Sequence, residues 1–207
     1  MMNRASVIQQ IEQYFDQDNF FSDLSRRVSI RTESQIPEQH ANLHRYLEDE
    51  IAAELVDIGF TFTIEKNPVA GGGPVLIAQR EEDPAFTTVL TYGHGDVVRG
   101  YDDQWRRGLN PWVLTREGDR WFGRGSADNK GQHTINLAAL RCVLAYRGYL
   151  GFNIKILIET GEEVGSIGLR ELCAANKDRL SADVFIASDG PRIAPARPTV
   201  FMGSRGA

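Results

Sequence analysis

The chain has 207 residues, of which 42% are hydrophobic and 25% are charged, and its formal net charge at pH 7 is −5. This length and composition are typical of one soluble globular domain, and the negative charge disfavours nucleic acid or an anionic membrane as a partner. We find neither the run of roughly 20 apolar residues that a membrane helix needs nor a signal peptide at the start of the sequence. Cys142 and Cys173 have no paired spacing, which predicts reduced cysteines and a cytoplasmic location.

The first third of the chain is predicted to be mainly helical. Apolar residues lie loosely on one helical face over residues 6–28, and a second helix is expected from about Pro37 to Gly59, with proline near its first turn and glycine closing it. Three short β-rich runs follow, at residues 61–65, 75–79 and 87–92.

The second half alternates helices and strands. We expect a well-buried helix over residues 130–146, a strand at 152–158, a short helix at 166–175 and a strand at 184–187. A last strand is expected to begin at Thr199. The alternation predicts an α/β fold, with a mostly parallel mixed sheet covered by helices on both faces.

Four polar sequences stand where apolar strands are expected to stop, at the ligand-binding edge of this sheet. In such sheets, ligands gather at the carboxyl ends of the strands. The four sequences are Gly93-His94-Gly95-Asp96, the segment 123–131 that enters the buried helix, Glu159-Thr160-Gly161-Glu162-Glu163, and Ser188-Asp189-Gly190. The coincidence of acid or imidazole at all four places predicts a metal site.

The residue types in these sequences suit zinc. Zinc takes imidazole nitrogen and carboxylate oxygen at about 2.0–2.2 Å, and catalytic sites leave one position open for water. His94, Asp128, Glu163 and Asp189 supply three negative charges, so two Zn²⁺ ions and a bridging hydroxide would form a neutral set. Without a cation, some of these carboxylates would have to take up protons.

Two further acidic residues have predicted roles beside the metal ligands. Asp96 lies two residues after His94 and is expected to orient its ring, as zinc-bound histidines usually require. Glu162 precedes a predicted ligand and is the natural general base, taking a proton from metal-bound water.

At these residues the chain resembles the co-catalytic di-zinc metallopeptidase and amidohydrolase family, which includes carboxypeptidase G, aminoacylase, acetylornithine deacetylase, succinyl-diaminopimelate desuccinylase and dipeptidases. The family motif His-x-Asp is matched at residues 94–96, and Gly-Arg-Gly-x-x-Asp-x-Lys-Gly at residues 123–131. Its Glu-Glu pair with a following Gly-Ser-x-Gly turn is matched at residues 162–168, and its later aspartate at Asp189. The resemblance runs from about residue 20 to the end of the chain.

The resemblance implies the fold of a zinc-peptidase-like (phosphorylase/hydrolase-like) catalytic domain. It implies that Asp128 bridges two zinc ions, that His94 and Asp189 bind one of them, and that Glu163 binds the other. It also implies a cis peptide bond between Asp128 and Asn129. The implied activity is hydrolysis of an amide bond in a small peptide or N-acyl amino acid.

The chain departs from the family pattern in one important respect. Family members complete the Glu163-bound zinc with a histidine far along the chain, and they insert a smaller domain that binds substrate and often dimerises. No histidine follows Asp189 here, so residues 1–207 are expected to be the N-terminal portion of the catalytic domain, and a homodimer is expected for the full-length protein only. The alternative is a non-catalytic metal- or ligand-binding remnant, and Co²⁺ or Mn²⁺ could replace Zn²⁺ in such a mixed site.

The remaining histidines have simpler interpretations. His40 and His44 lie on the second expected helix, where solvated or capping roles are typical. His133 lies in the first turn of the buried helix, and we interpret it as a structural residue. The alternative is that it contacts residues that support the metal ligands.

Overall fold

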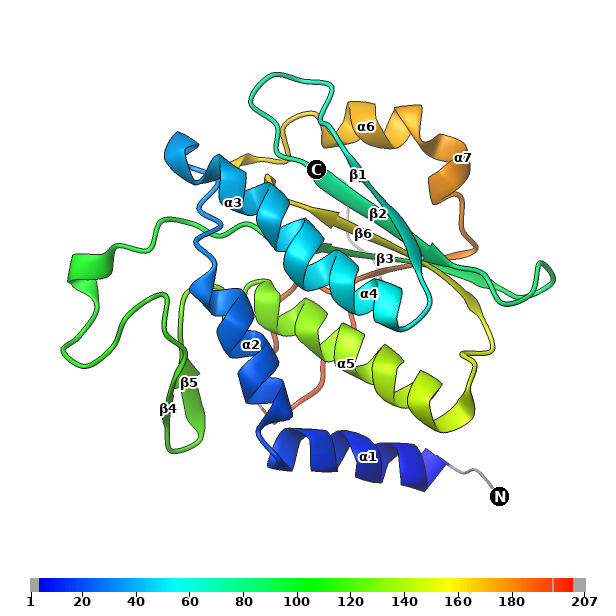
Figure 1. The fold of residues 1–207 in the computed structure, drawn as a ribbon, viewed down its shortest axis with the longest axis horizontal. Coiled ribbons are helices and arrows are strands. Elements are labelled where there is room, and N and C mark those ends of the chain that lie inside the picture. Colours follow the sequence, from blue (N-terminus) through cyan, green and yellow to red (C-terminus); the bar gives the residue numbers. More distant parts are fainter. Residues whose placement is uncertain (1–3, 195, 203–207) are drawn as a thin grey trace.

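A computed structural model describes residues 4–194 and 196–202 (Figure 1). Its centre is a five-stranded mixed sheet in the order β1-β2-β6-β3-β7. The strands are β1 (Thr61–Glu65), β2 (Val75–Arg80), β3 (Thr88–His94), β6 (Asn153–Glu159) and β7 (Val184–Ala187). β3 pairs in parallel with both β6 and β7, whereas β1–β2 and β2–β6 are antiparallel. The parallel strands therefore form the side of the sheet where ligand sites are expected.

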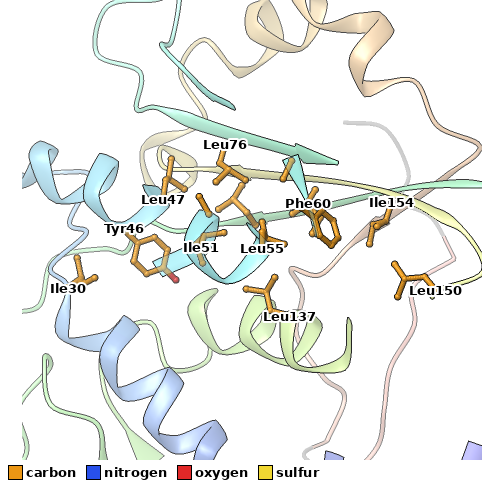
Figure 2. Close-up of a cluster of buried hydrophobic side chains, with 14 residues drawn as sticks. Ile30, Tyr46, Leu47, Ile51, Leu55, Phe60, Leu76, Leu137, Leu150 and Ile154 are labelled. Carbon is orange, nitrogen blue, oxygen red and sulfur yellow. The ribbon is translucent and has the colours of Figure 1, made fainter. Parts of the chain in front are cut away.

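Alternating residues of the central strands pack on opposite faces of the sheet. Leu76 and Ala78 of β2 and Ile156 of β6 pack on one face against residues of η2 (Tyr46–Ala52), a π-helical segment, and of α5 (Lys130–Arg147). Figure 2 shows this cluster, with Leu47, Ile51 and Leu137 facing the sheet from the helices. On the other face, Val75, Ile77 and Leu157 pack with residues of α6 (Leu169–Ala175). Helices on both faces confirm the predicted α/β layers.

The remaining helices flank this framework. They are α1 (Arg4–Asp16), α2 (Asn19–Ser29), η1 (Pro37–Gln39), α3 (His40–Arg45), α4 (Ala53–Asp57) and α7 (Lys177–Leu180), with the short 3₁₀ turns η3 (Asp102–Gln104) and η4 (Glu162–Val164). The segment from α3 through η2 to α4 lies beside α5 in Figure 1. None of the described helices is long and apolar enough to cross a membrane.

Several details differ from the elements expected from the sequence, among them the short helix α7. The first helix is broken into α1 and α2 at Asp18, whose φ of 61° lies in the left-handed region. An unpredicted hairpin, β4 (Thr115–Glu117) and β5 (Arg120–Phe122), turns at Gly118. Residues 199–202 form no strand, so the strand predicted from Thr199 is wrong over those residues, and its continuation lies outside the described part of the chain.

The last strand of the sheet is open on both faces. Phe185 is 62% exposed and Ile186 is 51% exposed. An apolar hollow lies on each side of the strand, one lined by Leu137 and Leu140 of α5 and the other by Leu169 of α6. β7 therefore exposes apolar side chains on both of its faces, and it ends two residues before Asp189.

Asp23 ties α2 to α5 and should make part of the stability depend on pH. Burial raises the pKa of its carboxyl, but hydrogen bonds from Tyr14, Arg141 and Arg26 outweigh burial and lower the pKa to about 2. A depressed pKa stabilises the fold above the unfolded value, 3.8, and this contribution disappears as the pH falls through about 2.

We therefore expect Asp23→Asn to lower the free energy of unfolding by about 1–2 kcal/mol at pH 6. This difference in unfolding free energy from wild type should shrink steadily between pH 4 and pH 2. Urea unfolding of both proteins at several pH values would measure it. A difference that stays constant with pH would show that the carboxylate charge of Asp23 is not the stabilising feature.

Candidate metal centre

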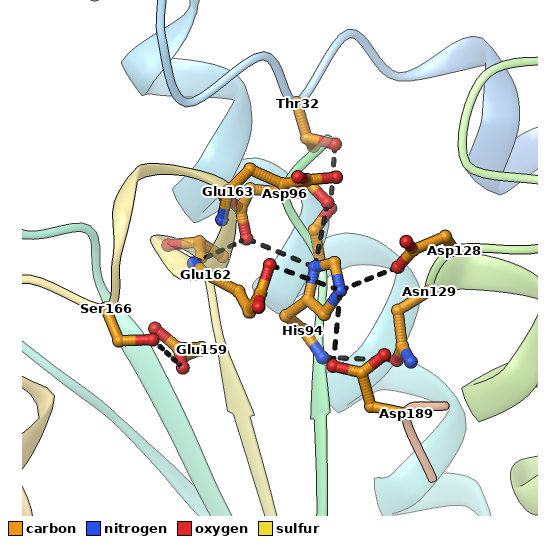
Figure 3. Close-up of polar contacts among 12 residues, drawn as sticks. Thr32, His94, Asp96, Asp128, Asn129, Glu159, Glu162, Glu163, Ser166 and Asp189 are labelled. Carbon is orange, nitrogen blue, oxygen red and sulfur yellow. Dashed lines mark hydrogen bonds and ion pairs between the residues drawn. The ribbon is translucent and has the colours of Figure 1, made fainter. Parts of the chain in front are cut away.

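The carboxyl ends of the parallel strands bring the predicted residues to one edge of the sheet. His94 is the last residue of β3 and lies opposite Glu159, the last residue of β6. β7 pairs with β3 up to Ala187, so Asp189 follows two residues beyond the same edge. Asp128 reaches the edge from the loop that precedes α5. Figure 3 shows the side chains of Asp128 and Asp189 facing the imidazole of His94, whereas Glu159 faces Ser166.

The imidazole of His94 is buried and presents one nitrogen to the carboxylates. Its Nδ1 lies 3.1 Å from the backbone oxygen of Asp96 and 3.4 Å from Asp96 Oδ1, an environment that places the ring hydrogen on Nδ1. Its Nε2 lies 3.0 Å from Asp128 Oδ1 and 3.8 Å from Asp189 Oδ2. A cation bound between these oxygens would replace the proton on Nε2, while the other ring hydrogen stays on Nδ1.

Three ligand atoms from His94, Asp128 and Asp189 all lie within 4.8 Å of one another. One imidazole nitrogen with two carboxylate oxygens is a set of ligand types that Zn²⁺ takes in proteins. Among the described residues, no such three-member group contains Glu163. The residues present therefore fit a cation on the His94 side of Asp128.

Electrostatics favour a cation at this position. Burial lowers the pKa of His94, but the hydrogen bond with Asp96 and the charges of Asp96, Asp189 and Asp128 outweigh it and raise the pKa to about 9. Burial raises the pKa of Glu163, and the charge of Asp128 adds to it. A divalent cation would relieve the repulsion between these carboxylates.

Asp96 connects His94 to the predicted base. Its side chain is fully buried, and its Oδ1 and Oδ2 accept the backbone N–H groups of Glu162 at 3.2 Å and Glu163 at 3.1 Å. The carboxylate therefore holds the turn η4 against the end of β3 as well as facing the His94 ring. Glu162 Oε2 lies 3.9 Å from His94 Nε2, and its side chain is 38% exposed, so Glu162 is open to water beside the candidate ligands.

The cis peptide bond between Asp128 and Asn129, expected from the family resemblance, is present. The other three histidines lie outside the candidate ligand cluster. His40 Nε2 lies 3.1 Å from the backbone oxygen of Ser34, and His44 faces Glu48 on the surface. His133 is buried on α5, and it contacts Tyr46 and Asn129 instead of the carboxylates.

Sequence reasoning gave no role to two buried residues at this edge. Glu159 is 2% exposed, and its Oε1 accepts hydrogen bonds from Tyr92 at 2.6 Å and Ser166 at 2.8 Å, which fixes the loop between β6 and α6. Asn129 contacts the backbone of His94 and Ser188. The signal for both was their position inside the strand-end sequences, next to predicted ligands.

Comparison with known proteins places this geometry in a family. The family model described as Peptidase family M20/M25/M40 matches residues 90–199, which include all four of the polar sequences that carry the predicted site residues. The chain belongs to this peptidase family. The cysteinylglycine-S-conjugate dipeptidase of Corynebacterium striatum is 32% identical over 193 residues, a match that covers 92% of this chain and 41% of the relative.

Solved structures of the family agree with the fold. Human carnosine dipeptidase 1 superposes with a TM-score of 0.81 at 32% identity, covering 91% of this chain and 41% of that one. An M20 family metallo-carboxypeptidase from Sulfolobus solfataricus has a TM-score of 0.73 at 28% identity, covering 83% of this chain and 37% of that one. The chain thus has the M20 catalytic fold and spans about two fifths of the length of these relatives.

Proposed function

We propose that this chain supplies the metal-binding half of a zinc-dependent hydrolase that cleaves the amide bond of a dipeptide, with N-acyl amino acids as the alternative substrates. The observation that carries the proposal is the convergence of His94, Asp128 and Asp189 within 4.8 Å at the carboxyl edge of the sheet. The names of two relatives, cysteinylglycine-S-conjugate dipeptidase and β-Ala-His dipeptidase, support the dipeptide class.

His94, Asp128 and Asp189 would hold one zinc ion, and Asp128 with Glu163 would contribute to a second. Bound zinc supplies Lewis acidity, which polarises a carbonyl group and lowers the pKa of water. Asp96 sets the His94 ring so that Nε2 faces Asp128 and Asp189, where the ion would bind, and the same carboxylate holds the backbone from which Glu162 and Glu163 project.

Glu162 would move the proton. Burial raises the pKa of its carboxyl, and the charges of Asp189, Asp96 and Asp128 add to this against the opposing charge of His94. A carboxylate with a raised pKa is a better proton acceptor near neutral pH. As the water oxygen bonds to the amide carbon, Glu162 takes a water proton, and it returns that proton to the nitrogen as the carbon–nitrogen bond breaks.

The zinc content of this chain tests the metal site. After dialysis against zinc and removal of free metal, we expect at least one tightly bound zinc per chain, and we expect Asp128→Ala to lose it. Asp57→Ala is the matched control, because Asp57 is an exposed aspartate on α4. Inductively coupled plasma mass spectrometry measures the content.

The measured zinc content also distinguishes one bound zinc ion per chain from two. Two zinc ions would mean that Glu163 holds the second ion with ligands from this chain, and one ion would assign binding to the His94 side. A folded chain that binds no zinc, or an Asp128→Ala variant that binds as much as wild type, would contradict the proposed metal site. Zinc binding without hydrolysis in any longer form of the protein would favour the non-catalytic alternative.

A further inference from the structure

The side-chain amide of Asn129 connects three of the segments that carry the candidate ligands. Its Oδ1 accepts the backbone N–H of His94 at 3.2 Å, and its Nδ2 donates to the backbone oxygen of Ser188 at 2.7 Å. Asn129 itself follows Asp128, and Ser188 precedes Asp189. One buried amide therefore contacts or adjoins all three members of the metal-sized cluster (Figure 3).

We propose that Asn129 is the positioning residue of this site, and that His133 and Tyr46 hold its amide in the orientation that sets the spacing of the three ligands. The inference deepens the proposed function, since it rests on a cation binding among His94, Asp128 and Asp189.

All the main hydrogen-bonding positions of the Asn129 amide have partners. Oδ1 also faces His133 Nδ1 at 3.2 Å, and Nδ2 also donates to Gln132 Oε1 at 2.5 Å. Two donors face the oxygen and two acceptors face the nitrogen, so the contacts determine which way the amide points. The side chain is fully buried, where the loss of a partner is costly.

His133 and Tyr46 continue the chain of contacts into the core. The Tyr46 hydroxyl lies 2.5 Å from His133 Nε2, and both side chains are buried. A hydrogen on His133 Nδ1 is donated to Asn129, which leaves Nε2 to accept the hydroxyl hydrogen of Tyr46. Burial lowers the pKa of His133 well below its ordinary value, in agreement with this neutral form. Figure 2 shows Tyr46 anchored in the apolar cluster beside Leu47 and Ile51.

Gly93 of β3 leaves space for the side-chain amide of Asn129, which lies close to the strand at this residue. A Cβ atom on Gly93 would lie 2.8 Å from Asn129 Oδ1, so only glycine lets β3 come this near. The hydrogen bond from His94 depends on that approach. Gly93 therefore belongs to the same arrangement as Asn129, His133 and Tyr46.

Asn129→Asp is the decisive variant because it keeps the side-chain shape and removes both N–H donors. It also adds a negative charge beside the ligands, which by itself would favour a cation. Electrostatics alone therefore predicts tighter zinc binding, whereas loss of positioning predicts weaker binding. The two explanations give opposite signs.

Asn153→Asp is a matched control at the other end of β6. Asn153 is 7% exposed, its Oδ1 accepts the backbone N–H groups of Glu82 and Asp83, and its Nδ2 donates to the backbone oxygens of Asp83 and Phe86. Asn153→Asp also removes two N–H donors from a buried amide, but it lies away from the candidate metal ligands. Any effect shared by both variants reports general destabilisation.

Three measurements on the 207-residue chain test the proposal. Hydrogen exchange of the metal-free protein should be several-fold faster over residues 92–96 and 186–190 in Asn129→Asp than in wild type and Asn153→Asp. Zinc affinity, measured by competition with a chromophoric chelator, should fall about 10–100-fold, and the visible spectrum of bound Co²⁺ should change. Asn153→Asp should alter neither the affinity nor the spectrum relative to wild type.

Tyr46→Phe keeps the test decisive if Asn129→Asp does not fold. It retains the aromatic ring and removes the hydroxyl that contacts His133 Nε2. We therefore expect smaller changes of the same sign in hydrogen exchange and zinc affinity. Unchanged exchange at both segments, or zinc affinity equal to or tighter than wild type in the folded variants, would overturn the proposal. If wild type binds no zinc, the metal site fails while the exchange comparison still decides whether Asn129 positions these segments.

Discussion

Replacing Glu162 with glutamine should lower kcat for dipeptide hydrolysis by about 10²–10⁴-fold while leaving zinc content unchanged, in an enzyme that contains this chain in full. Glutamine has the shape of glutamate but cannot take a proton from water. The N–H of residue 162 would still be held by Asp96 Oδ1, as it is in wild type at 3.2 Å. The measurement is steady-state hydrolysis beside metal analysis of the same samples.

Glu163→Gln is the informative comparison, because the neighbouring carboxylate has the same backbone support from Asp96. If Glu163 is a ligand, its variant should lose zinc together with activity, whereas the Glu162 variant should lose activity alone. Glu171→Gln, at an exposed position on α6, should change neither quantity. A Glu162→Gln enzyme with wild-type turnover would remove Glu162 from the role of base.

The positions of the four strand-end sequences could be predicted because they depend on short-range patterns. Apolar runs mark strands, the parallel arrangement follows from alternating helices and strands, and the carboxyl ends of parallel strands share an edge. The predicted strands at residues 87–92, 152–158 and 184–187 match β3, β6 and β7 closely. The parallel pairing of β3 with β7 brings His94 and Asp189 to one edge of the sheet, and Asp128 joins them from the loop that precedes α5.

Other features depend on contacts between distant segments, which periodicity does not encode. The sequence identifies Asn129 only as the residue after a predicted ligand, because its hydrogen bonds to residues 94 and 188 require the register of β3 with β7. Asp96 was expected to orient His94, but its hold on the backbone of η4 depends on how β3 and β6 are placed.

Two local sequence features do indicate the helix break and the hairpin that the apolar pattern does not predict. Gln17-Asp18-Asn19 is polar and tolerates the left-handed conformation found at Asp18, which ends α1. Glu117-Gly118-Asp119 has the turn glycine of the β4–β5 hairpin, with a φ of 60° at Gly118. A helical pattern continuing across residues 6–28 concealed the first, and the shortness of the strands concealed the second.

The support of the site reaches into the helical layer through Arg27. Its guanidinium is fully buried and forms an ion pair with Glu54 of the α4 helix and a hydrogen bond to Thr134 Oγ1 of α5 at 2.6 Å. The Arg27 backbone oxygen also accepts Lys130 Nζ at 2.8 Å, at the first turn of α5. Arg27 thus fastens α2 to the helix that begins directly after Asp128 and Asn129.

Arg27→Met should lower the free energy of unfolding by about 3–5 kcal/mol, because it leaves the 10%-exposed carboxylate of Glu54 without its buried partner. Arg141, at 3.3 Å, is a weaker and more exposed replacement. Arg26→Met is the matched control: Arg26 is the adjacent arginine, its side chain is 52% exposed, and its loss should cost about 1 kcal/mol or less. Urea unfolding at pH 7 measures both.

A second substitution separates loss of the ion pair from loss of packing. When both charges of a buried pair are removed, the cost of leaving one charge unpaired disappears. Adding Glu54→Gln to Arg27→Met should therefore recover part of the lost stability, although Glu54→Gln alone is destabilising. If the double variant is as unstable as the sum of the single variants, the role of Arg27 is to fill space between α2 and α5, and its charge contributes nothing.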